Sequence, residues 1–557
     1  MQIRHIAIRR FRGIEDFTWK PRPGVNCLIG PGDTFKSTVL AAISLLLAPY
    51  PLGPCSEFDF HRRRLADGFE IEAYIGSLDL AALGTDQRLP HLFGWENGHP
   101  VPLPEDGAEA VLRCRVRGTP DLELVYELPI EGTEQAPPFS SALRRKFMLS
   151  RLAGEDRASR DLRLGIGSLL DRHLKTSDMR GSVHAAIADA TSGMDIPQTS
   201  RDALAAITRT FGSAGLPTDL HLGLVPTQGN ALVGMVALVS GRTVTEAIPL
   251  THAGSGTKQL ALISLSAALL GAAPILVIDE PERGLEPYRQ RAVTQQLTEL
   301  AGHDGQVFLT THSPTVLSTL PTGSVWRMRQ RQEPACFDGA PLTKLLADDP
   351  EAFFCPMPIL CEGVTEMGFI DELLPAALGT SLDRCGIHPV DGGGQPNVLT
   401  VAEAFIQSGM RCAAILDNES RHSGTRLIIE QQITAMVWRN AVNIEDAVCK
   451  WLPLDGLFSL LPHAHASSGT AVRYLEDQIF ETIPLPDRQG TARDLRTSAY
   501  PEAVLRTAFF GAMDRLSWFK SREGGRILAR ALIAIRMPQQ IERQFTDFVA
   551  RLRPLVS

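Results

Sequence analysis

A loop of small residues between two apolar runs, Gly30-Pro31-Gly32-Asp33-Thr34-Phe35-Lys36-Ser37-Thr38, constrains this chain more than any other feature. The run before the loop, residues 25–29, is typical of a buried strand, and the run after it, residues 39–47, of a buried helix. In that context, backbone N–H groups and a helix N-terminus cradle phosphate. We therefore expect ATP to bind here, with Lys36 on the outer phosphates and Ser37 on one Mg²⁺ ion. The expected phosphate-binding residues are Gly30, Gly32, Asp33, Thr34, Lys36, Ser37 and Thr38.

One position departs from the pattern G-x-x-x-x-G-K-[ST], because Phe35 stands where the second glycine is usual. If that position needs a positive φ, a phenylalanine is strained there. The sequence therefore predicts nucleotide binding by a reshaped loop, with weakened affinity and slow turnover.

Three later stretches continue the nucleotide-binding pattern in order. Ser255-Gly256 opens a long apolar helix, which makes a second anion-binding loop. Asp279-Glu280 ends the apolar run 274–278, where an aspartate is placed to bind Mg²⁺ and the glutamate to orient or deprotonate a water. The strand-like run 306–311 ends at His312, which is placed to sense the γ-phosphate.

A second group of acidic residues begins two-thirds of the way along the chain. Glu362 follows the apolar run 358–361, and Glu366 lies one helical turn further on. Asp417 and Glu419 follow the run 412–416, and Glu445 opens a helix after the run 435–438. The carboxyl ends of parallel strands share one edge of a sheet, so these carboxylates would share one crevice there. Because hard cations take oxygen ligands, the sequence predicts a divalent-metal site there. Glu362, Glu366, Asp417, Glu419, Ser420 and Glu445 are its expected ligands.

Composition leaves the partner open but excludes several classes of protein. With 557 residues, 44% of them hydrophobic, the chain has core enough for several domains. It contains no run of about 18 apolar residues and its N-terminus lacks a signal core, so we expect a cytoplasmic protein without membrane contact. The nine cysteines form no C-x-x-C pair, which argues against zinc ribbons and disulfide frameworks. A net charge of −8 argues against wholesale nonspecific binding of nucleic acid, while leaving room for a local basic surface. The arginine-rich residues 143–175 are either such a DNA-contacting surface or a solvated helix face.

The first 330 residues resemble the ABC-type ATPase head of RecF and SMC proteins. The resemblance rests on Phe11-Arg12-Gly13-Ile14, the Ser255-Gly256 loop, Asp279-Glu280-Pro281 and Thr311-His312-Ser313, which occur in the order of that group. In that group the signature loop of one subunit caps the ATP bound to the other. The resemblance therefore implies a homodimer or a higher homo-oligomer.

The unit that follows resembles a TOPRIM domain, marked by Glu362 and the Asp417/Glu419 pair. An ABC-type head followed by TOPRIM resembles the overcoming-lysogenization-defect (OLD) family of ATP-dependent nucleases, including Gabija-type subunits. That family's usual Asp-x-Asp appears here as Asp417-Asn418-Glu419, and glutamate reaches further than aspartate. The resemblance also implies a late functional lysine, for which Lys520 is the candidate; an ordinary surface lysine is the alternative. Glu362, Asp417, Lys520 and Glu280 are thus the expected catalytic residues.

The expected fold class is α/β: an ABC-type P-loop ATPase head with an inserted helical subdomain, then a TOPRIM parallel α/β domain and a helical C-terminal region. The expected boundaries are 1–135 and 216–335 for the two parts of the head and 136–215 for the insertion, which is expected to serve dimerisation. The TOPRIM domain is expected at 356–450 and the helical region at 451–557.

The function that these features favour is a DNA endonuclease that binds and hydrolyses ATP. The family resemblance alone implies a role in prokaryotic defence against phage. Two Mg²⁺ or Mn²⁺ ions in the TOPRIM site and one with ATP are the expected cofactors. DNA is the expected substrate, and a helicase-like or other defence-system protein is an expected partner. The alternative is a RecF/SMC-like repair or sensor ATPase without nuclease activity. A topoisomerase-like strand transferase is a weaker option, because none of the six tyrosines is convincingly placed beside a basic cluster.

Overall fold

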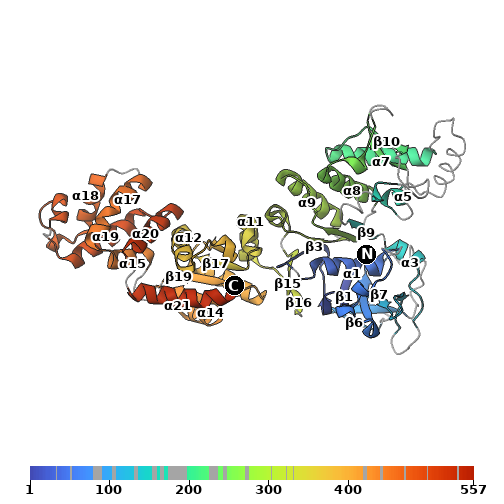
Figure 1. The fold of residues 1–557 in the computed structure, drawn as a ribbon, viewed down its shortest axis with the longest axis horizontal. Helices are drawn as coiled ribbons and strands as arrows, with labels where there is room; N and C mark the ends of the chain where they lie inside the picture. The colour runs from blue at the N-terminus through green and yellow to red at the C-terminus, as the bar shows by residue number, and fades with distance from the viewer. Residues whose placement is uncertain are drawn as a thin grey trace. The chain divides into compact units, whose positions relative to one another are not determined.

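The chain forms two compact units, Met1–Asp338 and Gly339–Ser557, in a computed structural model (Figure 1). The structure describes residues 1–32, 34–49, 53–78, 91–102, 108–130, 136–147, 149–152, 160–163, 168–173, 197–224, 236–241, 247–269, 275–302, 304–321, 323–329, 332–417, 423–438, 443–468, 472–497, 500–535 and 539–556. Among them, no helix combines the length and the apolar character that crossing a bilayer requires.

Two larger sheets build the first unit. One has the order β2-β1-β4-β7-β5-β6, is antiparallel, and has β8 paired to β7. The other has the order β16-β15-β3-β14-β13-β9, and all of its pairs except β15–β16 are parallel. A small sheet, β10-β11-β12, completes the unit. The strands are β1 Gln2–Phe11, β2 Ile14–Trp19, β3 Gly24–Ile29, β4 Phe69–Gly76, β5 Leu92–Glu96, β6 His99–Val101, β7 Glu109–Gly118, β8 Leu124–Glu127, β9 Leu149–Leu152, β10 Leu220–Leu224, β11 Val236–Ser240, β12 Ile248–Pro249, β13 Ile275–Asp279, β14 Gln306–Thr310, β15 Val325–Arg329 and β16 Gln332–Cys336.

Helix α1 lies between the two larger sheets and contributes to their shared core. It packs against β13 and β14 of the parallel sheet and against β1, β4 and β7 of the antiparallel sheet. Most of its apolar side chains are buried in that core, which stabilises the helix. The buried helix in turn fixes the position of the loop that precedes it. Among the other helices, α9 packs against β3 and β14, α8 against β9, and α7 against β10. The helices are α1 Lys36–Leu47, α3 Ser141–Lys146, α5 Leu169–His173, α7 Gln198–Ser213, α8 Ser255–Leu269, α9 Pro287–Ala301 and α10 Pro314–Thr319.

The expected helical insertion contains a strand. Leu149–Leu152 forms β9, the parallel edge strand beside β13, so residues 136–215 are not helical throughout as expected. Four residues carry too little periodicity to separate a strand from a helix, and pairing with β13 decides the outcome. The basic residues of this segment do not form one surface either. Arg144 is buried, with its guanidinium carbon 3.5 Å from the centre of the Tyr126 ring. Arg157 and Lys175 lie outside the described residues.

The second unit is built on a parallel sheet with the order β18-β17-β19-β20. Its strands are β17 Met357–Cys361, β18 Ile387–Asp391, β19 Ala413–Leu416 and β20 Thr434–Val437. This parallel pairing confirms the predicted parallel α/β domain, and β17 and β19 end directly before Glu362 and Asp417. Its helices are α11 Ala340–Asp348, α12 Val364–Leu378, α13 Gln395–Gln407, α14 Ser423–Gln432 and α15 Ile444–Trp451.

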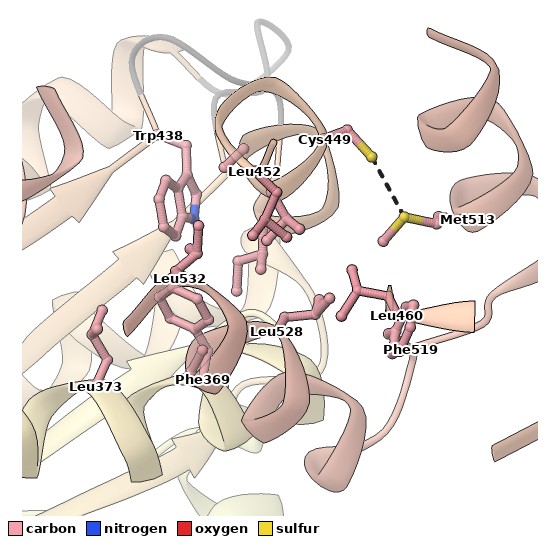
Figure 2. Packing of buried hydrophobic residues seen from close by; sticks show 14 of the residues in the cluster. Phe369, Leu373, Trp438, Cys449, Leu452, Leu460, Met513, Phe519, Leu528 and Leu532 are labelled. Carbon is pink, nitrogen blue, oxygen red and sulfur yellow. Dashed lines mark hydrogen bonds between the residues drawn. The ribbon is translucent and has the colours of Figure 1, made fainter. Parts of the chain in front are cut away.

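The C-terminal part of this unit is helical, as expected, and shares one core with the sheet. Trp438 and Phe369 from the sheet side lie in the same apolar cluster as Leu528 and Leu532 of α20 (Figure 2). Helix α21 returns to pack against β20 and α12. These helices are α16 Leu454–Ser459, α17 Leu461–Ser468, α18 Val472–Thr482, α19 Glu502–Leu516, α20 Arg522–Ala534 and α21 Gln539–Val556.

Helices α12 and α20 touch backbone to backbone through two glycines. A Cβ on Gly368 would lie 1.8 Å from Arg522 O, and one on Gly525 would lie 1.9 Å from Thr365 O. No side chain fits at either position. Ion pairs frame this contact, since Arg522 and Arg526 both bind Asp371, with distances of 2.7 and 2.8 Å. The start of α20 is thereby fixed against the first turns of α12.

Replacing Gly525 with alanine should lower the melting temperature of the protein, because the new methyl group overlaps the backbone of α12. Overpacking of this kind costs about 1–3 kcal/mol or more. Differential scanning fluorimetry would measure the loss. Gly53→Ala is the matched control, because a Cβ on Gly53 meets no atom within 4 Å. Equal melting temperatures for the two variants would contradict the close contact.

Candidate functional site

The loop before α1 has the strained backbone that its sequence predicts. Phe35 adopts φ 63° and ψ 22°, the left-handed conformation for which glycine is usual. Its ring packs over the β1–β2 turn, where a Cβ on Gly13 would lie 1.9 Å from Phe35 Cε1. Phe35 is therefore accommodated by a glycine in a different motif.

The lysine of this loop is folded onto the loop itself. Lys36 Nζ donates to Gly30 O and Pro31 O, both at 2.9 Å, and Thr34 Oγ1 donates to Pro31 O at 2.8 Å. These carbonyl partners hold a buried ammonium inside the curve of the loop. Gly32 leaves open space where a side chain would stand, and Thr38 follows in the first turn of α1. Asp33 lies outside the described residues.

The ends of β13 and β14 bring the other expected nucleotide-site residues to this loop. Ser37 Oγ donates to Asp279 Oδ1 at 3.1 Å, and the Thr310 hydroxyl donates to the same oxygen. His312 Nε2 lies 3.8 Å from Glu280 Oε1. Glu280 has φ 53°, so its backbone turns sharply at the strand end. The Ser37–Asp279 contact puts the two expected Mg²⁺ ligands side by side.

The start of α8 touches the segment that follows β13. A Cβ on Gly256 would lie 2.3 Å from Gly284 O, and one on Gly284 would lie 2.4 Å from Ser255 Oγ. Gly284 also has φ 73°. The two expected signature-loop residues are therefore packed on the turn that leads out of Asp279-Glu280.

In the second unit, Glu362 ties the ends of two neighbouring strands together. Its Oε1 accepts a hydrogen bond from Asp417 N at 2.6 Å and one from Gln395 Nε2 at 2.9 Å. Gln395 Nε2 also donates to Asp417 O at 2.9 Å. Glu362 thus leaves β17 and bonds to the residue that leaves β19.

Four carboxylates gather at this edge of the sheet: Glu362, Glu366, Asp417 and Glu445, which we call the carboxylate crest. Burial, together with the charges of Glu362, Glu366 and Glu445, raises the pKa of Asp417 to about 9. Burial and the charges of Glu445 and Glu362 raise the pKa of Glu366 to about 7. Like charges this close in a desolvated space disfavour ionisation of Asp417 and Glu366. The crest therefore retains protons near neutral pH unless a cation replaces them.

Lys520 supplies one cation to the crest. Its Nζ lies 2.8 Å from Glu445 Oε1, and only 1% of the Glu445 side chain is exposed. Although burial lowers the pKa of Lys520, the charges of Glu445, Glu366 and Asp417 raise it by more. Asp446, the neighbour of Glu445, instead binds Lys450 on its own helix at 2.8 Å. The two neighbouring acids therefore have separate cationic partners.

The negative charge of the crest suits a divalent cation, but its carboxylates are not already arranged around one metal position. Among the described residues, no three acidic, histidine or cysteine side chains stand close enough to hold an ion as placed. Gln395 Oε1 and Glu445 Oε2 are nevertheless buried without a hydrogen-bond donor among those residues, which is the unmet demand that a cation would satisfy. Glu419 and Ser420, the other expected ligands, lie outside the described residues.

Three residues of these sites escape a motif search. Thr310 binds Asp279, Gln395 binds both Glu362 and Asp417, and Glu282 accepts from His312 N at 2.8 Å. Burial raises the pKa of Glu282. The sequence offers one clue to Gln395, because it is the first residue of a helix that follows a glycine run. The other two need the strand pairing that the structure supplies.

Replacing Phe35 with glycine should tighten ATP binding severalfold, because glycine adopts this backbone conformation without strain. Titration with a fluorescent ATP analogue would measure the affinity. Phe35→Ala separates the causes, since it removes the ring and keeps the strained backbone. If both variants bind ATP as wild type does, the backbone at this position does not limit affinity.

Comparisons with known proteins support two domains. The AAA_21 family, described as "AAA domain, putative AbiEii toxin, Type IV TA system", matches residues 138–318. The family described as "Overcoming lysogenization defect protein-like, TOPRIM domain" matches residues 353–418. No curated protein matches the chain.

Solved structures of SMC heads are similar to part of the chain. The SmcHead bound to the C-winged helix domain of ScpA has 15% sequence identity and a TM-score of 0.40, covering 62% of this chain and 100% of that one. The Smc head domain with an extended coiled coil bound to the C-terminal domain of ScpA, from Pyrococcus furiosus, has 13% identity and a TM-score of 0.38, covering 60% and 96%. The two family matches, at residues 138–318 and 353–418, show that the chain carries an AAA_21 ATPase domain followed by an OLD-like TOPRIM domain.

Proposed function

We propose that the protein is an ATP-regulated, divalent-metal-dependent DNA endonuclease of the OLD type. The observation that carries this proposal is the buried Glu445 carboxylate, paired to the partly exposed Lys520, beside Glu362, Glu366 and Asp417 at the edge of a TOPRIM sheet. Burying Glu445 among several other carboxylates is an expensive arrangement for stability alone, since one ion pair rarely repays the desolvation of a buried charge. Function is the better reason to keep it.

Phosphodiester hydrolysis suits this arrangement. The reaction needs an activated water, a stabilised leaving oxygen and neutralised charge on the phosphoryl group. Mg²⁺ or Mn²⁺ supplies all three when bound, two ions being the usual complement. Glu362, Glu366, Asp417 and Glu445 would hold the ions, with Glu419 and Ser420 completing the set.

The protein side chains prepare the site for this charge. Hydrogen bonds from Gln395 and the Asp417 backbone hold the Glu362 carboxylate in one orientation. The Lys520 side chain is 41% exposed while it is paired to Glu445. Its ammonium group can therefore reach an incoming phosphate without leaving the crest. Lys520 would then neutralise negative charge that develops during cleavage.

The ATPase domain would control cleavage. Lys36, Ser37, Asp279 and Glu280 would bind and hydrolyse ATP with one Mg²⁺, and His312 lies beside Glu280. We also propose a homodimer in which the Ser255-Gly256 loop of one subunit completes the ATP site of another. Antiphage defence in the cytoplasm, with a helicase-like partner, is the role that the OLD-like domain favours.

A sensor or repair ATPase without nuclease activity is the second candidate. The observation that favours it is the lack of three preassembled ligands among the described residues. In that function the carboxylate crest would be structural, and its integrity would matter for folding alone.

Nicking of supercoiled plasmid in Mg²⁺ or Mn²⁺ tests the proposal. Wild type should convert the plasmid to nicked or linear forms, whereas Glu362→Gln and Asp417→Asn should lower the rate at least about a hundredfold, because each removes a carboxylate that would bind the metal. Both should hydrolyse ATP as wild type does, while Lys36→Ala and Glu280→Gln should lose hydrolysis. Equal cleavage by wild type and the crest variants, or none with any metal and nucleotide, would exclude the nuclease.

A further inference from the structure

A group of arginines lies on the first unit, on and beside the β1–β2 turn that contacts Phe35. Its members are exposed and come from the β1–β2 turn and from the short 3₁₀ segments Glu57–Asp59, His61–Arg63 and Leu65–Asp67. We call Arg10, Arg12, Arg62, Arg63, Arg64 and the neighbouring Phe58 the arginine surface.

Direct contacts hold the two halves of this surface together. Arg12 N donates to Asp59 O at 2.9 Å, and Arg12 Nε donates to Asp59 Oδ1 at 3.0 Å. His61 Nδ1 lies 2.9 Å from Arg12 O, and Arg10 Nε donates to Gly68 O at 3.2 Å. The turn and the 3₁₀ segments therefore form one surface.

Most of the positive charge on this surface has no carboxylate partner. Asp59 neutralises Arg12, while Arg10, Arg62, Arg63 and Arg64 make no ion pair with any described residue. Glu57 and Asp67 stand at the two ends of the segment, so the surface keeps a basic centre. Exposed guanidinium groups without carboxylate partners suit phosphate, which a guanidinium binds through two N–H groups at once.

Backbone conformation marks the same residues. Arg10, Arg12, Arg62 and Arg63 all have φ between 50° and 57°, which L-residues rarely adopt. Such conformations cost energy and gather where function requires them. Here they turn arginine side chains outward from consecutive positions.

An exposed aromatic ring lies within the surface. Phe58 is 60% exposed, and the Arg63 guanidinium carbon lies 4.5 Å from its centre. An unburied phenylalanine has little structural purpose, whereas aromatic rings among basic side chains are typical of nucleic-acid contacts. Phe35 is the other exposed phenylalanine in the described part of the chain, and its ring covers Gly13 in the same turn.

We propose that the arginine surface binds the phosphate backbone of DNA. The inference rests on the proposed function for its choice of DNA, and it locates a DNA contact on the ATPase unit, separate from the carboxylate crest. Because Gly13 supports Phe35, DNA held on this surface contacts the turn that shapes the ATP loop. DNA bound there could therefore change the conformation of the ATP loop through Gly13 and Phe35.

Fluorescence anisotropy with a labelled duplex, in EDTA so that no cleavage occurs, tests this proposal. Replacing Arg62, Arg63 and Arg64 together with serine should weaken binding about tenfold or more and lower the slope of log K against log salt by about 2–3. Replacing Arg493, Arg515 and Arg543 with serine is the matched control, since they are exposed and make no ion pair with described residues. The control should change affinity less than about twofold.

Several results would overturn the proposal: unchanged affinity and salt slope in the Arg62/Arg63/Arg64 variant, an equal loss in the control, or a loss confined to an RNA duplex of the same sequence. Melting curves and ATP binding would show that each variant is folded. The plasmid assay is independent. Cleavage by wild type with unchanged DNA affinity in the variant would reject the arginine surface and keep the nuclease, whereas the reverse result would keep the surface and reject the nuclease.

Discussion

The backbone contact between α12 and α20 is the constraint on which the second site depends. Gly368 and Gly525 allow the two helices to touch, and Asp371 binds two arginines of α20 across the contact. Lys520 precedes α20 by two residues, and Glu366 lies in the first turn of α12. The glycines therefore bring a cation from near the end of the chain to a carboxylate that follows the first strand of the sheet. Phe369 of α12 and Leu528 of α20 also share the apolar cluster in Figure 2.

Glycines also allow close contacts between distant segments in the ATPase unit. Gly13 makes room for Phe35, and Gly256 and Gly284 let the start of α8 approach the segment after β13. In each case a motif is completed by a glycine from a distant part of the chain. Substitution at such a glycine would disturb a functional loop without touching a functional side chain.

Much of the fold follows from the sequence, because buried parallel strands produce continuous apolar runs that end at acidic residues or glycines. The runs before Glu362, Asp417 and Asp279 each form the predicted strand. Phe35 was predictable as a strained residue from its position alone, and its φ of 63° confirms this. Strand β9 was not predictable, because four residues carry too little pattern and their pairing comes from β13. Gln395 and Thr310 also escape prediction, since their roles depend on which strand ends meet.

The carboxylate crest is one desolvated space whose charge suits cations. Because burial raises the pKa of Asp417 to about 9 and that of Glu366 to about 7, protons occupy the crest at low pH, and a metal ion must displace them. Calorimetric titration with Mn²⁺ at about pH 6 and at about pH 9 is the most direct test. We expect an affinity at least about tenfold higher at the higher pH, lost in Asp417→Asn and kept in Asp279→Asn. Affinity that is independent of pH, or unaffected by Asp417→Asn, would contradict it.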